Sequence, residues 1–214
     1  MSGSLELHNV ACERGGRRLF SGLSRSIHPG ELLRVQGDNG AGKTSLLRMM
    51  CGLMEPAEGQ LLWRGQPTSS LKEELGRELI YLGHAAALKD DLSALENLQV
   101  ACTLSGQPTS EPAARRALAA AGLRDHEHTP VRKLSQGQRK RSALARLALG
   151  HARPDLPPSM PLWVLDEPFN SLDSKATAWL VGLINTQLQQ GGLVVLTSHQ
   201  TVALDEMPHQ VLAL

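Results

Sequence analysis

The sequence predicts an α/β fold in which a parallel sheet is interrupted by a helical insertion. Short apolar runs of strand length occur at "LIYL" (Leu79–Leu82), "LWVL" (Leu162–Leu165) and "LVVL" (Leu193–Leu196). A long stretch of helical pattern, residues 93–150, separates the first two runs, and another helical stretch separates the last two. Strands that alternate with helices favour a parallel sheet, because parallel neighbours need a crossover connection.

The N-terminal part is predicted to be β-structure that leads into a helix. Residues 1–35 alternate polar and apolar side chains, with a turn at Gly15-Gly16, and run into the strand-like "ELLRVQG". A helix is expected over residues 43–51, and Gly52 is placed to cap its C-terminus.

The helical insertion has a recognisable start and internal breaks. Ser93-x-x-Glu96 matches the capping box, in which two side chains satisfy the free N–H groups of a first helical turn. Residues that punctuate helices follow at Ser110, Pro112, Gly122 and Gly150. The Pro-rich segment 151–161 after them is expected to be an exposed loop.

The bulk composition is that of a soluble globular protein. The chain has 214 residues, 41% of them hydrophobic and 20% charged, with a net charge of +1. That charge gives no reason to expect nucleic acid as a partner. No signal peptide and no membrane-spanning run is expected, so a role at a membrane would need a partner. The three cysteines show no CxxC spacing and suit a reducing compartment.

A glycine-rich loop is the strongest single motif. "GDNGAGKT" has the spacing Gly-x4-Gly-Lys-Thr and lies between a predicted strand and a predicted helix. Glycines let backbone N–H groups converge on phosphate oxygens, Lys43 adds a mobile charge, and the Thr44 hydroxyl can coordinate Mg²⁺. The expected ATP-binding residues are Gly37, Asp38, Asn39, Gly40, Ala41, Gly42, Lys43, Thr44 and Ser45.

Two carboxylates follow the apolar strand at residues 162–165. Asp166 and Glu167 come at its C-terminal end, where an α/β sheet binds its ligands. Asp166 is placed to hold Mg²⁺ through water, and Glu167 to activate the attacking water as general base.

A third motif, "LSQGQ", precedes an amphipathic helix. Ser135 is expected to be the N-cap of that helix, and Gly137 permits close backbone approach. By itself this pattern is no more than a capped helix.

Together, these motifs resemble those of ATP-binding cassette (ABC) ATPases. "GDNGAGKT", "LSQGQ", "VLDEP", "SLD" and "TSH" stand in the order and spacing of that family, along almost the entire chain. The resemblance implies a RecA-like P-loop core with an N-terminal antiparallel β part and an inserted α-helical subdomain. It divides the single domain, residues 1–214, into an ATP-binding core (1–84 and 151–214) and a helical subdomain with the signature motif (85–150).

The family's mechanism implies further roles. Two cassettes would stack head to tail as a homodimer, with ATP between the loop of one and the signature of the other, namely Ser135, Gln136, Gly137 and Gln138. Asp173 would couple the two sites, and His199 would contact the γ-phosphate as a catalytic residue. ATP and Mg²⁺ are the implied cofactors.

Finer resemblance points to one subfamily. "ACERGGRRLFSGLS", "GDNGAGKTSLLRMMCGL" and "YLGH...LK..LSALENL" look like the ATP-binding subunit of the haem exporter of bacterial cytochrome c maturation. That resemblance implies permease subunits that span the membrane, an indirect link to a haem chaperone, and a peripheral place on the cytoplasmic side of the inner membrane. Two alternatives remain: an ABC exporter for another substrate, or a soluble ABC-type assembly or regulatory ATPase.

His84 and Arg14 depart from ordinary cassettes. His84 stands where cassettes keep a Gln, and it is expected to act in coupling and as a weaker Mg²⁺ contact; the alternative is a histidine that merely ends a strand. Arg14 stands where many cassettes have an aromatic side chain on the adenine. Either its guanidinium stacks on the base or base recognition is loose, which predicts weak discrimination of ATP from GTP.

Two other polar clusters are given structural interpretations. The "DHEH" segment, residues 125–128, is expected to be a solvated turn rather than a metal site. The basic side chains of Arg139, Lys140, Arg141 and Arg146 are expected to form a charged surface opposite the apolar face of their helix, with contact to a permease or partner cassette as the alternative.

Overall fold

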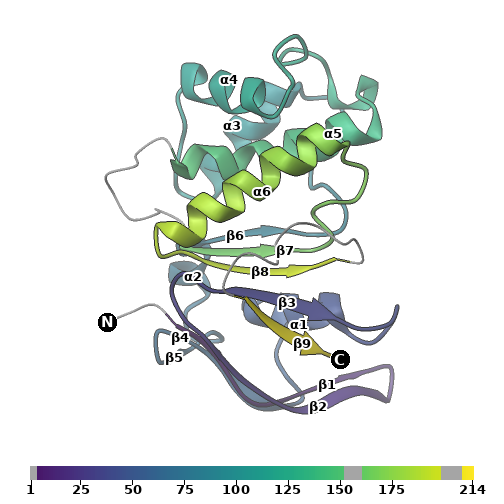
Figure 1. The fold of residues 1–214 in the computed structure, drawn as a ribbon, viewed down its shortest axis with the longest axis vertical. Coiled ribbons are helices and arrows are strands. Elements are labelled where there is room, and N and C mark those ends of the chain that lie inside the picture. The colour runs from purple at the N-terminus through teal and green to yellow at the C-terminus, as the bar shows by residue number, and fades with distance from the viewer. Residues whose placement is uncertain (1–3, 152–160, 199–208) are drawn as a thin grey trace.

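The protein, analysed as a computed structural model, is described over residues 4–151, 161–198 and 209–214. Two sheets and a block of helices form successive layers (Figure 1). An antiparallel sheet contains β1 (Leu5–Arg14), β2 (Arg17–Ile27), β4 (Glu58–Trp63) and β5 (Gln66–Pro67) in the order β2-β1-β4-β5. The expected turn between β1 and β2 is present at Gly15 and Gly16, whose φ angles are 57° and 73°.

The second sheet is parallel, as the sequence predicted. It contains β6 (Leu79–Leu82), β7 (Leu162–Leu165), β8 (Leu193–Thr197), β3 (Leu32–Gln36) and β9 (His209–Ala213) in the order β6-β7-β8-β3-β9. Every strand pair in it is parallel. The carboxyl ends of these strands therefore meet at one edge, which is where open α/β sheets bind ligands.

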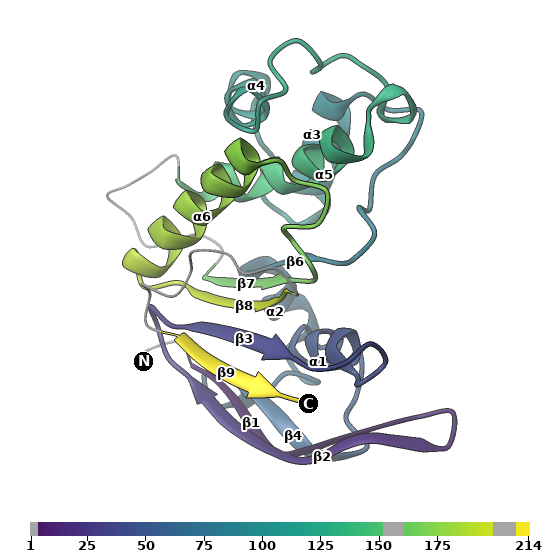
Figure 2. The same ribbon diagram turned by 45° about the vertical axis from the view of Figure 1, so that its right-hand side comes forward.

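The helices divide between the faces of this sheet and a separate block (Figures 1 and 2). The α-helices are α1 (Lys43–Met50), α2 (Lys72–Glu78), α3 (Ala94–Leu104), α4 (Glu111–Ala120), α5 (Gln136–Leu144) and α6 (Ser174–Gln189). Short 3-10 segments occur at η1 (Val131–Lys133) and η2 (Ala145–His151). Helices α3, α4 and α5 form the block, while α6 runs along one face of the parallel sheet.

Alternate residues of the parallel strands bury against different layers. Val164 and Val195 belong to a core shared with α1 and the antiparallel sheet. Trp163 and Leu196 point the other way, into a core shared with α6. This alternation is the period of two that a strand imposes, and burial on both faces explains the uninterrupted apolar runs.

Most predicted helix boundaries are confirmed. Helix α1 ends at Met50 with Cys51 as its cap, one residue from the expected end. Ser93 caps α3 with the complete capping box, and Ser110 caps α4 with Pro112 in its first turn. No sequence pattern predicted α2, β4, β5 or β9. Most of the segment 151–161, which was expected to be an exposed loop, lies outside the described residues.

Candidate functional site

The glycine-rich loop joins the end of β3 to the start of α1. Gly37, Gly40 and Gly42 have φ angles of 149°, 86° and 108°, a region that favours glycine. Gly42 is also packed tightly, since a Cβ there would lie 2.9 Å from Cε1 of Phe20 in β2. The antiparallel sheet thus fixes the loop at the N-terminus of α1, where backbone N–H groups and the helix dipole favour an anion.

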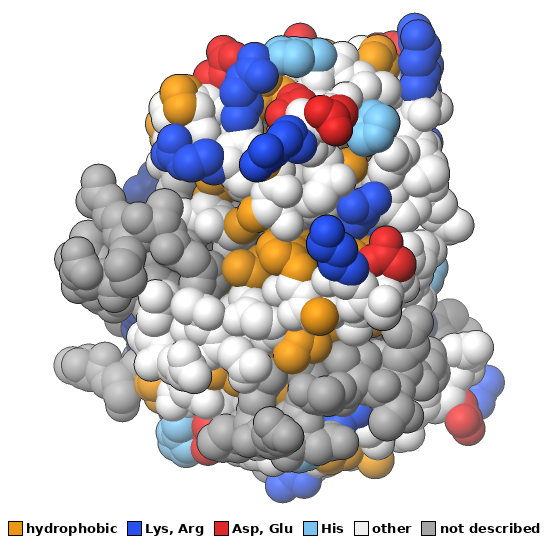
Figure 3. All heavy atoms as spheres, turned by 45° about the horizontal axis from the view of Figure 1, so that its top comes forward, with side chains coloured by type: hydrophobic (Ala, Val, Ile, Leu, Met, Phe, Trp, Pro, Cys, Tyr) orange, Lys and Arg blue, Asp and Glu red, His pale blue; other side chains and the backbone are white. Residues whose placement is uncertain are grey.

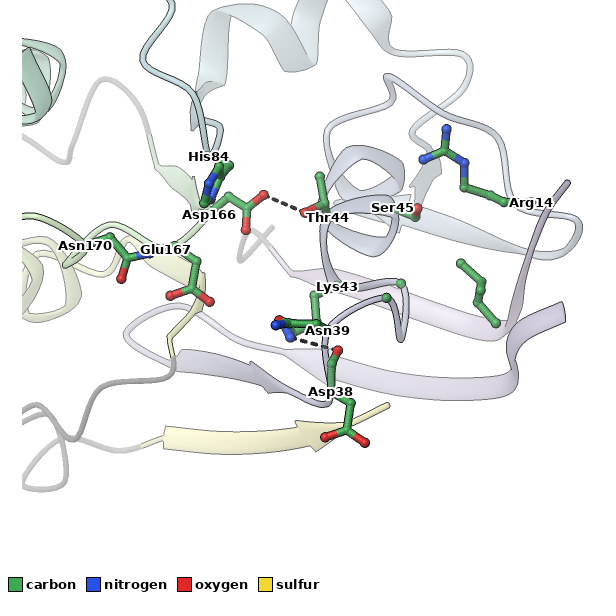
Figure 4. Close-up of a pocket in the computed structure, with 13 residues that line it drawn as sticks. Arg14, Asp38, Asn39, Lys43, Thr44, Ser45, His84, Asp166, Glu167 and Asn170 are labelled. Atoms are coloured by element: carbon green, nitrogen blue, oxygen red, sulfur yellow. Dashed lines mark hydrogen bonds between the residues drawn. The ribbon is translucent and has the colours of Figure 1, made fainter. Parts of the chain in front are cut away.

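Lys43 curls back over this loop (Figure 4). Its ammonium donates hydrogen bonds to the carbonyl oxygens of Gly37, at 2.6 Å, and of Asp38, at 3.1 Å. Both bonds hold a positive charge at the mouth of the loop, where a phosphate chain would need it.

A hydrogen-bond network joins the loop to the end of β7. The Thr44 hydroxyl donates to Asp166 Oδ2 at 2.7 Å, and the Thr197 hydroxyl donates to Asp166 Oδ1 at 2.8 Å. Thr197 Oγ1 in turn accepts the backbone N–H of Glu167 at 2.9 Å. Side chains from α1 and β8 therefore fix Asp166, which follows β7 and is only 3% exposed.

Glu167 follows with an unusual backbone. Its φ angle is 48°, in the left-handed region that non-glycine residues rarely adopt, and the residue is 7% exposed. Such strain persists only where surrounding contacts enforce it, and it concentrates at functional sites. In this chain the strained residue lies where the backbone turns away from the end of β7, next to the glycine-rich loop.

These groups line one open pocket of about 570 Å³ (Figure 4). The predicted site residues that line it are Arg14, Asp38, Asn39, Gly40, Gly42, Lys43, Thr44, Ser45, His84, Asp166 and Glu167. Gly37 and Ala41 belong to the same loop but do not line the pocket. Two lining residues, Leu19 and Asn170, were missed by the sequence analysis. Asn170 had one available signal, its place three residues after Glu167.

His84 lies on the turn that follows β6 and is exposed. The backbone N–H of Asp166 donates to the Leu82 carbonyl at 2.8 Å, so the ends of β6 and β7 lie side by side. This pairing explains why His84 and Asp166 line the same pocket.

The signature residues lie outside this pocket of their own chain. Ser135 caps α5 in a complete capping box with Gln138, as predicted. Gly137 also permits the predicted close approach, since a Cβ there would lie 2.9 Å from the Ser171 carbonyl oxygen. Asp173 caps α6 by accepting the Ala176 N–H at 2.8 Å. His199 falls outside the described residues.

The predicted basic surface, whose residues lie on α5 and, for Arg146, on η2, is wrong in part. Arg139 is ion-paired with Asp90, and Arg141 donates to the Ala121 and Gly122 carbonyls at the end of α4. Lys140 and Arg146 are half-buried, and burial lowers the pKa of both side chains. An amphipathic pattern could not reveal this, because a second layer packs against the polar face of the helix. Figure 3 shows basic and acidic side chains interspersed on the helical end of the molecule.

The donor set fits a hard cation shared with phosphate. Within residues 4–151, 161–198 and 209–214, no cluster of three or more His, Cys, Asp or Glu side chains could hold a metal alone. The Thr44 hydroxyl and the Asp166 carboxylate, however, are adjacent oxygen ligands beside the phosphate-type loop. Mg²⁺ is commonly held in this way, by few protein oxygens together with phosphate and water.

No helix in the described parts of the chain combines the length and apolar character that crossing a bilayer requires.

Comparison with known proteins gives consistent results. The family model described as ABC transporter matches residues 20–170. The chain is 46% identical to the cytochrome c biogenesis ATP-binding export protein CcmA of Pseudomonas aeruginosa, over 94% of this chain and 95% of that one. It is 48% identical to the protein of the same name from Aromatoleum aromaticum, over 90% and 86% of the two chains.

Solved structures support the fold. An ABC transporter ATP-binding protein from Pyrococcus furiosus superposes with a TM-score of 0.80 at 22% identity, over 98% of this chain and 97% of that one. The dimeric ATP-binding cassette MJ0796 bound to ADP and Pi superposes with a TM-score of 0.74 at 23% identity, over 92% and 88%.

Proposed function

The chain belongs to the ABC transporter family, and we propose that it is the ATP-hydrolysing subunit of a haem exporter used in the biogenesis of c-type cytochromes. Identity of 46% to a cytochrome c biogenesis ATP-binding export protein, over nearly all of both chains, carries this proposal. The work of the exporter is haem transport or the release of a haem-loaded chaperone on the far side of the membrane.

The loop of residues 37–45 binds the nucleotide phosphates. Its backbone N–H groups and the N-terminus of α1 supply fixed donors, while Lys43 supplies a charge that moves from the Gly37 and Asp38 carbonyls to the phosphate oxygens. The sequestered lysine supports this role, because its present hydrogen bonds are to neutral groups that a phosphate would outcompete.

Thr44 and Asp166 would hold Mg²⁺, Asp166 through water, with His84 as a weaker contact. When bound there, the ion would supply positive charge that offsets the charge of the phosphates. Thr197 keeps Asp166 oriented through the bond to Oδ1. Orientation of this kind by an outer partner is a common way to tune a metal ligand.

Glu167 acts as the general base that orients and polarises the attacking water. Its place at the end of β7, next to Asp166 and in the same pocket as Lys43, supports this role. His199 completes the site at the γ-phosphate by resemblance to the family.

Two copies of the chain work together as a head-to-tail homodimer. Ser135, Gln136, Gly137 and Gln138 act in trans on the nucleotide of the partner, and Asp173 couples the two sites. Their position outside the pocket of their own chain supports an action in trans. The dimer closes on ATP and opens after hydrolysis, which drives permease subunits in the membrane. The chain lies on the cytoplasmic face of the bacterial inner membrane.

Base recognition is loose. Arg14 is exposed at the pocket edge, beside Leu19 rather than an aromatic side chain. We therefore expect GTP turnover by the assembled complex to fall within about tenfold of ATP turnover, a difference below roughly 1.4 kcal/mol. A larger preference for ATP would contradict loose recognition.

His84 couples the site to the permease rather than performing the chemistry. A His84→Gln variant should keep ATP hydrolysis while its stimulation by the permease changes, because an amide replaces only part of the imidazole's hydrogen bonding. If hydrolysis, coupling and cytochrome maturation all survive His84→Ala, His84 is no more than a strand-end histidine.

The exporter role is tested by genetic complementation. A strain that lacks its own cytochrome c biogenesis ATPase, supplied with this chain and its cognate permease, should regain covalent haem in c-type cytochromes on a haem-stained gel. Lys43→Ala should not restore it, although the protein accumulates. Failure of the wild-type chain, with ATPase activity intact, would favour an exporter of another substrate or a soluble assembly factor. Neighbouring permease and haem-chaperone genes would favour the haem role.

A further inference from the structure

A short linking segment, residues 88–93, joins the turn that carries His84 to the start of α3. Its backbone pairs with the residues that lead into the signature motif. The N–H of Arg132 donates to the Asp90 carbonyl at 3.0 Å, two residues before Leu134 begins the "LSQGQ" sequence. The chain that follows His84 and the chain that precedes the signature are therefore bonded to each other.

Asn97, on α3, holds the linking segment through a buried amide. Its side chain is only 6% exposed, and its Oδ1 accepts the N–H of Lys89 at 2.7 Å. Its Nδ2 donates to the carbonyl oxygens of Lys89, Leu92 and Ser93 at 3.0, 3.2 and 2.9 Å. Loss of the amide would leave several backbone groups without their partner, which is costly where water is excluded. Asn97 thus fixes the linking segment at both of its ends.

An ion pair extends this connection to α5. The guanidinium of Arg139 donates a hydrogen bond to the carboxylate of Asp90. The backbone N–H of Arg139 closes the first turn of α5 by donating to the Ser135 carbonyl at 2.9 Å. A cation near the N-terminus of a helix is unfavourable, and a carboxylate beside it offsets that cost. The pair therefore ties the start of the signature helix to the linking segment.

This ion pair is suited to orientation rather than to stability. The side chains of Asp90 and Arg139 are both partly exposed, and pairs of that kind contribute little to the free energy of unfolding. The backbone of Asp90 is already ordered, however, by its bond to Arg132 and by the Asn97 amide nearby. Little further entropy is lost when the charges meet, so the pair can select one orientation of α5.

We propose that Asp90, Arg139 and Asn97 are positioning residues for the signature motif. Together they hold the N-terminus of α5 in a fixed place relative to the linking segment. The inference rests on the proposed action of the signature in trans, because a head-to-tail dimer needs Ser135 to meet the nucleotide of the partner in one orientation. The three residues set that orientation from within their own chain.

Exchange of the two charges in the assembled transporter tests the ion pair. Asp90→Arg and Arg139→Asp each place like charges together, and the double variant restores an opposite pair. We expect each single variant to lower kcat by about fivefold or more and to leave the KM for ATP within about twofold, because the phosphate loop is unchanged. The double variant should return to within about twofold of the wild-type kcat. An unchanged kcat in the single variants, or a double variant that is not restored, would overturn the role of the pair.

A second ion pair in the helical block supplies the matched control. Glu111 and Arg115 pair at 2.7 Å within α4, so Glu111→Arg is the same kind of charge reversal without a link to the signature. It should leave kcat at the wild-type value, and an equal loss of kcat would contradict positioning by Asp90. The urea midpoints of Asp90→Arg and Arg139→Asp should stay close to that of wild type. A loss of kcat that only follows a loss of folded protein would also contradict the proposal.

Hydrogen exchange in the full chain without nucleotide tests Asn97. The amides of Lys89 and Arg132 should exchange about tenfold faster in Asn97→Ala, because the linking segment opens locally. Thr103→Ala is the control, since the Thr103 hydroxyl donates to a carbonyl of α3 itself, at 2.9 Å. Equal exchange of these amides in the two variants would contradict the role of Asn97.

These outcomes are separate from the test of the ATPase assignment. The exchange measurement uses the resting chain, and the charge exchange is compared with an active wild-type transporter. Failure of either therefore removes the positioning role and leaves ATP hydrolysis by this chain standing. That assignment fails on its own if Glu167→Gln hydrolyses ATP.

Discussion

At the scale of single residues, Gly42 illustrates how packing fixes the loop. Both the positive φ angle and the Phe20 ring at 2.9 Å oppose a Cβ at this position. Gly40 has a similar φ angle of 86°, but no atom lies within 4 Å of an added Cβ. An alanine at Gly40 would therefore meet backbone strain alone, whereas an alanine at Gly42 would meet both backbone strain and steric overlap with Phe20.

We expect Gly42→Ala to lower the free energy of unfolding by about 2 kcal/mol or more, and Gly40→Ala by about 1 kcal/mol. The overlap with Phe20 adds to the strain only at Gly42. Urea denaturation of both variants measures the difference. Equal losses would show that Phe20 does not constrain the loop.

Tyr81 offers a second residue-scale test, because it is the chain's only tyrosine. Burial raises the pKa of its phenol, and the Asp166 charge adds to the effect. Arg48 opposes it through a hydrogen bond and its charge. The folded pKa thus exceeds the unfolded value near 10. Absorbance of the phenolate should rise at higher pH in the folded chain than in urea.

The sign for stability follows from this difference. Below the unfolded pKa both states keep the proton, and above it the unfolded state loses the proton first. The contribution of neutral Tyr81 to stability is therefore present below pH 10 and lost as pH rises toward the folded pKa. Tyr81→Phe should reduce the loss of stability above pH 10, and an unchanged alkaline loss would contradict the shift.

At the scale of elements, the helix starts are controlled by side-chain caps. Ser93, Ser110 and Ser135 all accept a backbone N–H from the first turn. The sequence patterns predicted these caps for Ser93 and Ser135, whereas Ser110 was predicted only as a break in the helical stretch. Asp173 does the same for α6, a role that the resemblance to the family had obscured. Asp173, which is expected to couple two subunits, thus also caps α6 within its own chain.

We expect Asp173→Ala to lower the free energy of unfolding of the isolated chain by about 1 kcal/mol, because an N–H of α6 loses its acceptor. Asp173→Asn retains a cap and should lose little. Thermal or urea unfolding of both variants measures this difference in the free energy of unfolding. If Asp173→Ala leaves stability unchanged, Asp173 contributes only across subunits.

The elements that the sequence did not reveal share a physical cause. Strand β4 begins with exposed residues and has only Leu61 and Trp63 fully buried, so its pattern of alternation is short. Strand β9 is similarly mostly exposed. The partial burial of Lys140 was missed for a related reason. The local sequence around a charged residue on a polar helix face does not show whether another part of the chain covers it.

At the scale of the whole molecule, the sequence predicted the architecture, and most residues that it predicted for the phosphate loop and the carboxylates line one pocket. Both results depend on local rules. Buried strands are recognisable as apolar runs, and a glycine-rich loop of this spacing between a strand and a helix is typical of phosphate binding. The contacts between distant segments could not be read in the same way. The bond from Thr44 to Asp166 and the packing of Phe20 on Gly42 both depend on how the layers meet.

The central claim, that this chain drives a transporter by ATP hydrolysis with Glu167 as general base, is tested most directly in the complex purified with its membrane partners. Hydrolysis and ATP binding are measured for the wild type and for Glu167→Gln. We predict that the variant still binds ATP while hydrolysis falls by at least about 100-fold, the contribution typical of a general base. Full ATPase activity of Glu167→Gln in that complex would contradict the claim.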